Sequence, residues 1–135
     1  MAPLRGSIMS LNSNILLCRS CSKWNNNITG ILNQIKISGH KASFSIVILM
    51  SDDNGDTGLA RSGFSLICQI VNKYTGKGKW LGDLNVQGVS VNSLDLILNL
   101  DVKSLLFEEE GEYEILVYLK NTGMCIAHTP LKVYF

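Results

Sequence analysis

Alternation of apolar and polar residues is the feature that most constrains how this chain of 135 residues can fold. The clearest case is segment 94–101, where leucine occupies every second position and mostly polar residues stand between. Side chains of a β-strand point alternately to opposite faces, so this pattern predicts a strand with one buried and one mostly solvated face. Segments 43–50 and 64–71 predict two more strands. The end of 43–50 is apolar on both faces, so that strand should lie centrally in a sheet.

Two pairs of Ile- and Leu-rich segments predict hairpins at the two ends of the chain. The polar stretch between the first pair ends in three asparagines at 25–27, and Asn favours tight turns. The second pair flanks Asn121-Thr122-Gly123, where glycine can supply the left-handed residue of a three-residue hairpin loop. The predicted strands of these hairpins are 14–21, 28–37, 112–120 and 124–135.

Sustained helical periodicity is missing from the sequence, so we expect no long helix. Segment 102–109 is predicted to form at most a short turn of helix. The Asp/Asn/Gly-rich segment 51–63 and the Gly/Lys-rich segment 73–88 are predicted to be loops. About seven or eight short strands with turn signals between them are typical of a β-sandwich or a small barrel.

Tyr113 favours the sandwich. It stands two residues after Gly111 and just before the alternating strand 115–119. In immunoglobulin-like sandwiches a tyrosine at the start of the penultimate strand turns its hydroxyl back onto the preceding corner, although an ordinary core aromatic would occupy the same position. We predict an all-β fold, an immunoglobulin-like antiparallel β-sandwich of about seven or eight strands over residues 14–135, with residues 1–13 as a flexible lead-in.

Both ends of the chain carry hydrophobic patterns that resemble a known family. Residues 15–18 (Ile-Leu-Leu-Cys) precede a polar turn and the second strand 28–35, and segment 111–133 reads as Gly-x-Tyr, strand, turn, strand. This combination is similar to an uncharacterised bacterial family of immunoglobulin-like β-sandwich domains. Segment 38–41 departs from it, because Ser-Gly-His-Lys stands where that family usually has an acidic residue and a proline. The resemblance implies the fold and no activity.

The charge balance argues against nucleic acid as a partner. The chain has 12 Lys and Arg against 11 Asp and Glu, a net charge of +1, so it lacks the basic field that attracts phosphates. The longest apolar run, 46–50, is far shorter than the roughly 20 residues of a membrane-spanning helix, and the N-terminus lacks the apolar stretch of a secretory signal. We therefore expect a soluble, cytoplasmic protein without membrane contact, with its four cysteines reduced.

Candidate catalytic and metal-binding groups are few. Cys18 and Cys21 have the spacing of half a zinc site, but a strand would point them to opposite faces. Segment 52–58 offers oxygen atoms at alternate positions without the pattern of an EF-hand, so we expect a surface turn and leave calcium binding open. His40 and His128 belong to no nucleophile motif and are expected on the surface. The prediction is a protein that is not an enzyme and uses no cofactor or metal.

Segment 73–88 is the most interesting candidate for a binding site. Tyr74, Lys77, Lys79 and Trp80 could together hold a carbohydrate or a nucleotide, by ion pairing and by stacking on the rings. Trp80 is predicted either to bind in this way or to anchor the loop from beneath. A small-molecule ligand at this segment is the alternative function.

Apolar residues on the solvent side of the last hairpin favour a protein partner. Leu116, Tyr118 and Tyr134 lie opposite the expected core positions of their strands. The hydrophobic content of 46% is also more than the interior of one sandwich requires. The main prediction is a non-enzymatic interaction module that binds a protein partner or forms a homodimer through this face.

Overall fold

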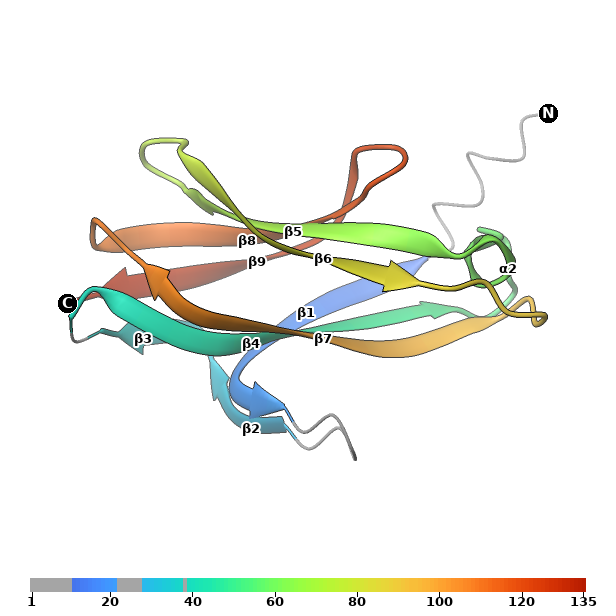
Figure 1. The fold of residues 1–135 in the computed structure, drawn as a ribbon, viewed down its shortest axis with the longest axis horizontal. Coiled ribbons are helices and arrows are strands. Elements are labelled where there is room, and N and C mark those ends of the chain that lie inside the picture. The colour runs from blue at the N-terminus through green and yellow to red at the C-terminus, as the bar shows by residue number, and fades with distance from the viewer. Residues whose placement is uncertain (1–10, 22–27, 38) are drawn as a thin grey trace.

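Nine strands form two packed sheets in the computed structural model of the protein, which describes residues 11–21, 28–37 and 39–135 (Figure 1). The four-stranded sheet has the order β2-β1-β4-β7, with β1 (Asn12–Cys21), β2 (Ile28–Leu32), β4 (Lys41–Asp52) and β7 (Leu94–Leu106). The five-stranded sheet has the order β3-β9-β8-β5-β6, with β3 (Gln34–Lys36), β5 (Phe64–Asn72), β6 (Gly78–Val86), β8 (Gly111–Leu119) and β9 (Met124–Tyr134). The predicted all-β, sandwich-like fold is confirmed.

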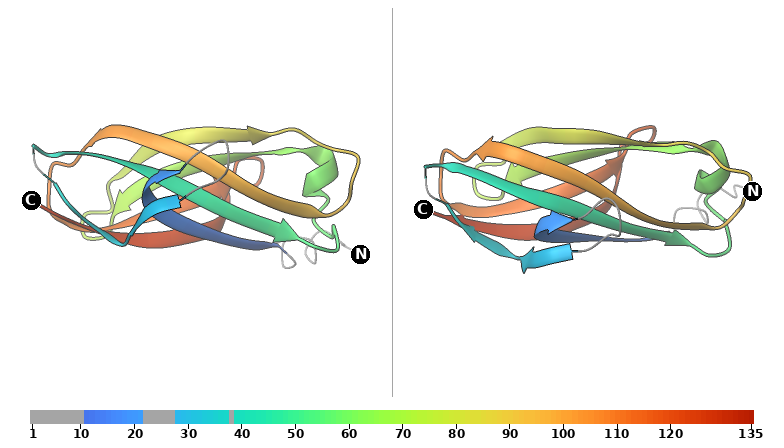
Figure 2. Two further views of the ribbon diagram at one scale, coloured as in Figure 1. Left: turned by 90° about the horizontal axis from the view of Figure 1, so that it is seen from below. Right: turned by 60° about the horizontal axis from the view of Figure 1, so that its bottom comes forward.

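The one helix among the described residues is α2 (Leu59–Ser62), a single turn. It lies at the end of the long axis opposite the C-terminus (Figures 1 and 2). It also interrupts the segment 51–63, which the sequence predicted as loop throughout. No helix in the described part of the chain is long and apolar enough to cross a lipid bilayer.

β4 is a central strand, as its two apolar faces predicted. It pairs with β1 on one side and with β7 on the other. Ile46, Val47 and Ile48 are consecutive residues, and the exposed fraction of each is 0%. Ile46 and Ile48 face the other sheet, whereas Val47 points to the outer face between its pair partners Leu16 of β1 and Asn99 of β7. A strand with paired neighbours on both sides therefore has flanking side chains beside it even on its outer face.

The core between the sheets consists of alternate residues from the long strands. Along β5 the burial strictly alternates between buried and half-buried residues, and β8 continues the same pattern from Tyr113 onward. The inward-facing set includes Ile46, Ile48, Leu66, Cys68, Ile115, Val117 and Leu131, all with an exposed fraction of 0%. This period of two is the pattern by which the sequence identified the strands.

The N-terminal segments form the predicted hairpin pair, with a difference in the second strand. β1 and β2 pair antiparallel, and β1 begins at Asn12, within the predicted lead-in. Segment 28–37 is not one strand, because the chain leaves the four-stranded sheet at Asn33 and continues as β3. β3 pairs parallel to β9, so the sandwich is not purely antiparallel, and the Asn33 carbonyl accepts a hydrogen bond from the Lys132 amide at 3.1 Å. The predicted turn at 25–27 lies outside the described residues.

Two further sequence predictions are wrong. Segment 102–109 is not helical, because β7 continues through it to Leu106. The pairing of β7 with β4 shifts register near its end, and Ser104 adopts a positive φ of 53°, which gives a bulge that disguises the strand pattern.

Segment 73–88 is not a loop, because it contains β6. β6 forms an edge of its sheet, where exposed Gly and Lys residues replace the usual apolar alternation.

The C-terminal hairpin of β8 and β9 agrees with the prediction, including the positive φ of 69° at Gly123 in its turn. The Tyr113 hydroxyl donates a hydrogen bond to the Glu109 carbonyl at 2.7 Å. This is the contact with the preceding corner that the Gly-x-Tyr pattern predicted.

Candidate functional site

The outer face of the five-stranded sheet brings together residues that the sequence had placed in separate candidate sites. Across this sheet Trp80 is paired with Gln69, Gln69 with Leu116, and Leu116 with His128. Directly paired residues share a face, and Gln69 alternates with the buried Cys68 and Ile70. Trp80 and Leu116 therefore lie in one row on the side away from the core.

The next row of the same face adds a second aromatic residue. Ile67 is paired with Tyr118 on β8 and with Asp83 on β6. Val71, further along β5, is also on this face because it alternates with Ile70. We call the set Trp80, Ile67, Val71, Leu116 and Tyr118 the aromatic face.

Trp80 is the most exposed member of the aromatic face, with 66% of its surface accessible. Its indole Nε1 donates a hydrogen bond to Asp83 Oδ1 at 2.8 Å, which fixes the ring on the strand. The other four members are half-buried. Trp80 is therefore not an anchor beneath a loop, which was one of the two roles considered for it.

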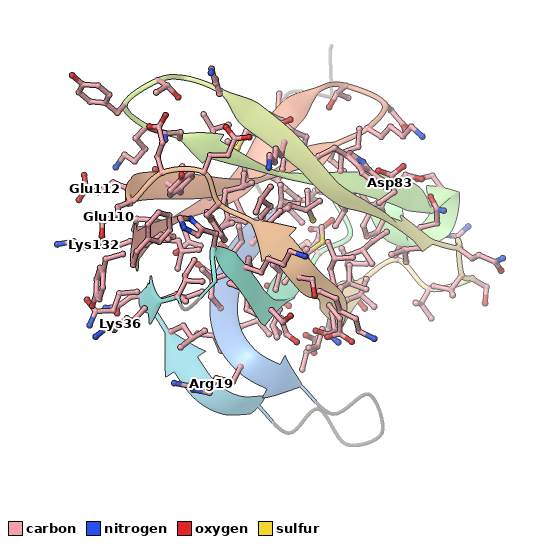
Figure 3. All side chains as sticks on the ribbon, turned by 60° about the vertical axis from the view of Figure 1, so that its left-hand side comes forward. Arg19, Lys36, Asp83, Glu110, Glu112 and Lys132 are labelled. Carbon is pink, nitrogen blue, oxygen red and sulfur yellow. The ribbon has the colours of Figure 1, made fainter. Side chains whose placement is uncertain are left out.

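Charged side chains of both signs surround the aromatic face. Glu114 forms an ion pair with Lys73 at 3.7 Å and a hydrogen bond with His128 Nδ1 at 3.1 Å, and Lys120 forms an ion pair with Asp83 at 3.7 Å. Figure 3 shows Glu112 and Lys132 near each other at one end of β8 and β9, with Asp83 on the opposite side of the view. The two ion pairs are at least partly open to solvent, so each contributes little to stability, but together they keep the face close to electrically neutral.

A cavity of about 400 Å³ lies between the β5–β6 turn and the corner that joins β7 to β8. Lys77 and Lys79 line it, whereas Trp80 and Tyr74 do not. Lys79 is paired with Ile70, so it points toward the core side of β6, opposite to Trp80. Tyr74 is 95% exposed in the turn. The candidate binding segment is thus divided among a turn, a cavity and the aromatic face.

A hydrogen-bond network closes one side of this cavity. The buried Asn72 accepts hydrogen bonds at Oδ1 from the amides of Tyr74 and Thr75, at 2.8 and 3.1 Å. Burial raises the pKa of Tyr113, a hydrogen bond from Asn72 lowers it, and the nearby Glu109 and Glu108 carboxylates raise it again. The polar groups of this wall are therefore used to hold the β5–β6 turn against the β7–β8 corner.

Tyr134, the remaining candidate from the last hairpin, is set apart from the aromatic face. It is half-buried near the C-terminal end of β9, where it is paired with Lys36 of β3. Leu116 and Tyr118 are paired with His128 and Cys125, in the first half of β9. The structure therefore joins Leu116 and Tyr118 to Trp80 rather than to Tyr134.

The cysteines and histidines considered as metal ligands or catalytic groups do not come together in one site among the described residues. Cys18 is buried, with its thiol directed at the Ser45 carbonyl at 3.9 Å, while nothing is described of the Cys21 side chain. His40 and His128 are exposed, as predicted. In the part of the chain that the structure describes, no three His, Cys, Asp or Glu side chains gather as a metal site.

In the acidic segment 52–58, the first carboxylate accepts hydrogen bonds from within the segment. Asp52 is 1% exposed, and its Oδ2 accepts hydrogen bonds from the Thr57 amide at 2.9 Å and the Thr57 hydroxyl at 2.5 Å. Asp53, Asn54 and Asp56 are exposed. The segment is a tight turn closed by Asp52, as expected of a surface turn.

Sequence reasoning missed the β5 contribution to the aromatic face. Ile67 and Val71 occupy the positions of segment 64–71 that alternate with the core residues, and both are apolar. Apolar residues on both faces of a predicted strand were the available signal. The signal could not be used for Trp80, because β6 itself was predicted as a loop.

Comparison with known proteins adds no functional information. No protein-family model matches the sequence, and no curated protein sequence matches it. One solved structure similar to the chain is the Pseudomonas fluorescens alkylpurine DNA glycosylase AlkC bound to DNA containing an abasic site analog, with a TM-score of 0.44 and 9% sequence identity. The similarity covers 93% of this chain and 31% of the glycosylase chain. It is too weak to carry an argument, and the immunoglobulin-like family stays a prediction.

Proposed function

We propose that this protein is a non-enzymatic interaction module that forms a homodimer through the aromatic face. The observation that carries the proposal is the register that places Trp80, Leu116 and Tyr118 in neighbouring rows on the outside of one sheet. Burial of apolar and aromatic surface drives association, and tryptophan and tyrosine are enriched among the residues that dominate interface energies.

The charge distribution favours a second copy of the chain as the occupant of this face. Its acidic residues are Asp83, Glu112 and Glu114, and its basic residues are Lys73, Lys120 and Lys132. Positive and negative residues occur at each end of β8. A second chain that packs on this face through a two-fold axis would therefore bring opposite charges as well as like charges together. An anionic polymer such as nucleic acid would find no basic patch there. A symmetric dimer needs such a self-complementary surface.

Sedimentation velocity over a range of protein concentrations tests the proposal. We expect the wild-type chain to shift from monomer to dimer as the concentration rises. Leu116→Lys places an unpaired ammonium in the centre of the interface and is expected to weaken the dimer at least about tenfold. Ile97→Lys is the matched control, because Ile97 is an exposed strand residue on the outer face of the other sheet.

Trp80 supplies a second measurement. Dimerisation would cover its indole, so its fluorescence should shift to the blue with rising concentration in a Trp24→Phe background, which leaves Trp80 as the only tryptophan. A chain that stays monomeric at the highest concentration contradicts the proposal. So does a dimer that Ile97→Lys weakens and Leu116→Lys leaves intact. Circular dichroism establishes that both variants are folded.

A further inference from the structure

The cavity beside the β7–β8 corner has the walls of a small-molecule site. Its volume of about 400 Å³ falls toward the lower end of the range of about 300 to 1,000 Å³ for ligand pockets. Five apolar or aromatic side chains from three strands and the corner line it: Ile70, Leu105, Leu106, Phe107 and Tyr113. Phe107 and Tyr113 pack edge to face, with ring centroids 5.1 Å apart. Such a space fits the apolar group of a compact ligand and is too small for a dinucleotide.

The cavity exists because the edges of the two sheets separate at this end. β7 is bulged near Ser104, and β6 is bulged where its register shifts beside Gln69, so both edge strands bend next to the cavity. Lys79 reaches across from β6 and donates a hydrogen bond from Nζ to the Leu106 carbonyl of β7 at 3.0 Å. That contact ties the two edges together and holds an ammonium group at the cavity.

Charged residues of opposite sign line the cavity, Lys77 from the β5–β6 turn and the two glutamates from the β7–β8 corner, while the Lys79 ammonium reaches across to the corner. Lys77 and Lys79 belong to β6 and its preceding turn, and Glu108 and Glu109 belong to the β7–β8 corner. The ion pairs among the described residues join other partners, so these four charges do not neutralise one another directly. Both glutamates line the cavity together with Tyr113, whose hydroxyl donates to the Glu109 carbonyl at 2.7 Å.

We propose that this cavity binds a small zwitterion with an apolar side group, namely a free α-amino acid with an aromatic side chain. Its carboxylate would face Lys77 on the β5–β6 turn, its ammonium would face Glu108 and Glu109 on the β7–β8 corner, and its ring would pack among the apolar walls. A ligand that carries only one charge would face residues of its own sign as well as residues of the opposite sign. Complementary charges on both sides of an apolar space therefore favour the zwitterion.

Isothermal titration calorimetry with three probes tests this assignment. L-phenylalanine carries both charges, 3-phenylpropionate carries only the carboxylate, and phenethylamine carries only the ammonium. We expect L-phenylalanine to bind at least about tenfold more tightly than either analogue, since each lost charge-assisted hydrogen bond weakens binding by about that factor. Absence of L-phenylalanine binding, or equal binding of an analogue, overturns the proposal.

Two substitutions assign the charges to their sides of the cavity. Lys77→Gln should weaken binding of L-phenylalanine about tenfold, and Glu109→Gln should do the same from the other side, because each removes one charge partner. Lys132→Gln is the control, since Lys132 lies on β9 and does not line the cavity. Unchanged binding in both cavity variants, or an equal loss in the control, overturns the proposal. The aromatic face is on the other side of the sheet, so Leu116→Lys should leave this binding intact, and the two proposals fail independently.

Discussion

Tyr113 is a residue whose contact with the β7–β8 corner could be predicted from the sequence, whereas its contact with β5 could not. Its ring is buried against Phe107, its hydroxyl donates to the Glu109 carbonyl, and the Asn72 side chain is a second hydrogen-bond partner. The Gly-x-Tyr pattern predicted the contact with the corner. It did not predict the contact with Asn72, because that residue comes from β5 and meets β8 only through the sheet pairing.

Tyr113→Phe is expected to lower the free energy of unfolding by about 1 to 2 kcal/mol, since it removes the hydroxyl and leaves the buried ring in place. Urea denaturation measures the change. Tyr74→Phe is the control, because the Tyr74 side chain is 95% exposed, and this change should be neutral. Equal stability of Tyr113→Phe and the wild type would show that the corner contact does not contribute.

The strands differ in how clearly their own sequence indicates a strand. β4 lies between two long strands and carries its own apolar residues on both faces, so its sequence identified both its type and its central place. β6 lies at an edge and carries Gly and Lys, so its sequence resembled a loop. The backbone hydrogen bonds of β6 come from β5, and the pattern of β6 alone contains no sign of them.

Two neighbouring residues of β4 should respond very differently to truncation. Ile48→Ala is expected to lower the free energy of unfolding by about 2 to 5 kcal/mol, because Ile48 is fully buried between the sheets and its loss leaves a cavity. Leu49→Ala removes a similar volume from the outer face, where 36% of the side chain is exposed, and should cost clearly less. Chemical denaturation of the two variants compares them. Equal losses would contradict the assignment of Ile48 to the core.

The molecule as a whole has two outer faces of different character. The aromatic face of the five-stranded sheet contains Trp80 and is rimmed by ion pairs. The outer face of the four-stranded sheet contains Leu49 and Ile97, paired across β4 and β7 and both partly exposed. Apolar residues on both outer faces contribute to the hydrophobic content of 46% beyond what the interior holds.

Alkaline pH is expected to weaken the whole fold through Cys68. Burial, together with the nearby Asp83 carboxylate, raises the pKa of the Cys68 thiol to about 11, whereas a thiol in the unfolded chain titrates near about 8.5. Between these values the unfolded state loses its proton and the folded state keeps it, so stability is full below about pH 8.5 and falls as the pH rises toward 11.

Urea denaturation at about pH 8 and pH 10 should therefore show a loss on the order of 2 kcal/mol in the wild type. Cys68→Ala should flatten this dependence while lowering stability at both pH values, because it also removes a buried side chain. Cys125→Ala, which changes an exposed thiol, should keep the wild-type slope. A slope that persists in Cys68→Ala would assign the alkaline transition to other groups.

The sequence by itself determined the class of the fold, the central position of β4, the C-terminal hairpin and the Tyr113 contact. Each of these depends on residues close together in the chain, where a period of two or a turn residue is a direct physical signal. Tertiary structure alone decided that the chain changes sheets at Asn33, that β6 is a strand, and that Trp80 shares a face with Leu116. These features depend on pairing between distant segments through backbone hydrogen bonds. Every residue except proline can donate and accept such bonds, so the local sequence does not reveal which segments pair.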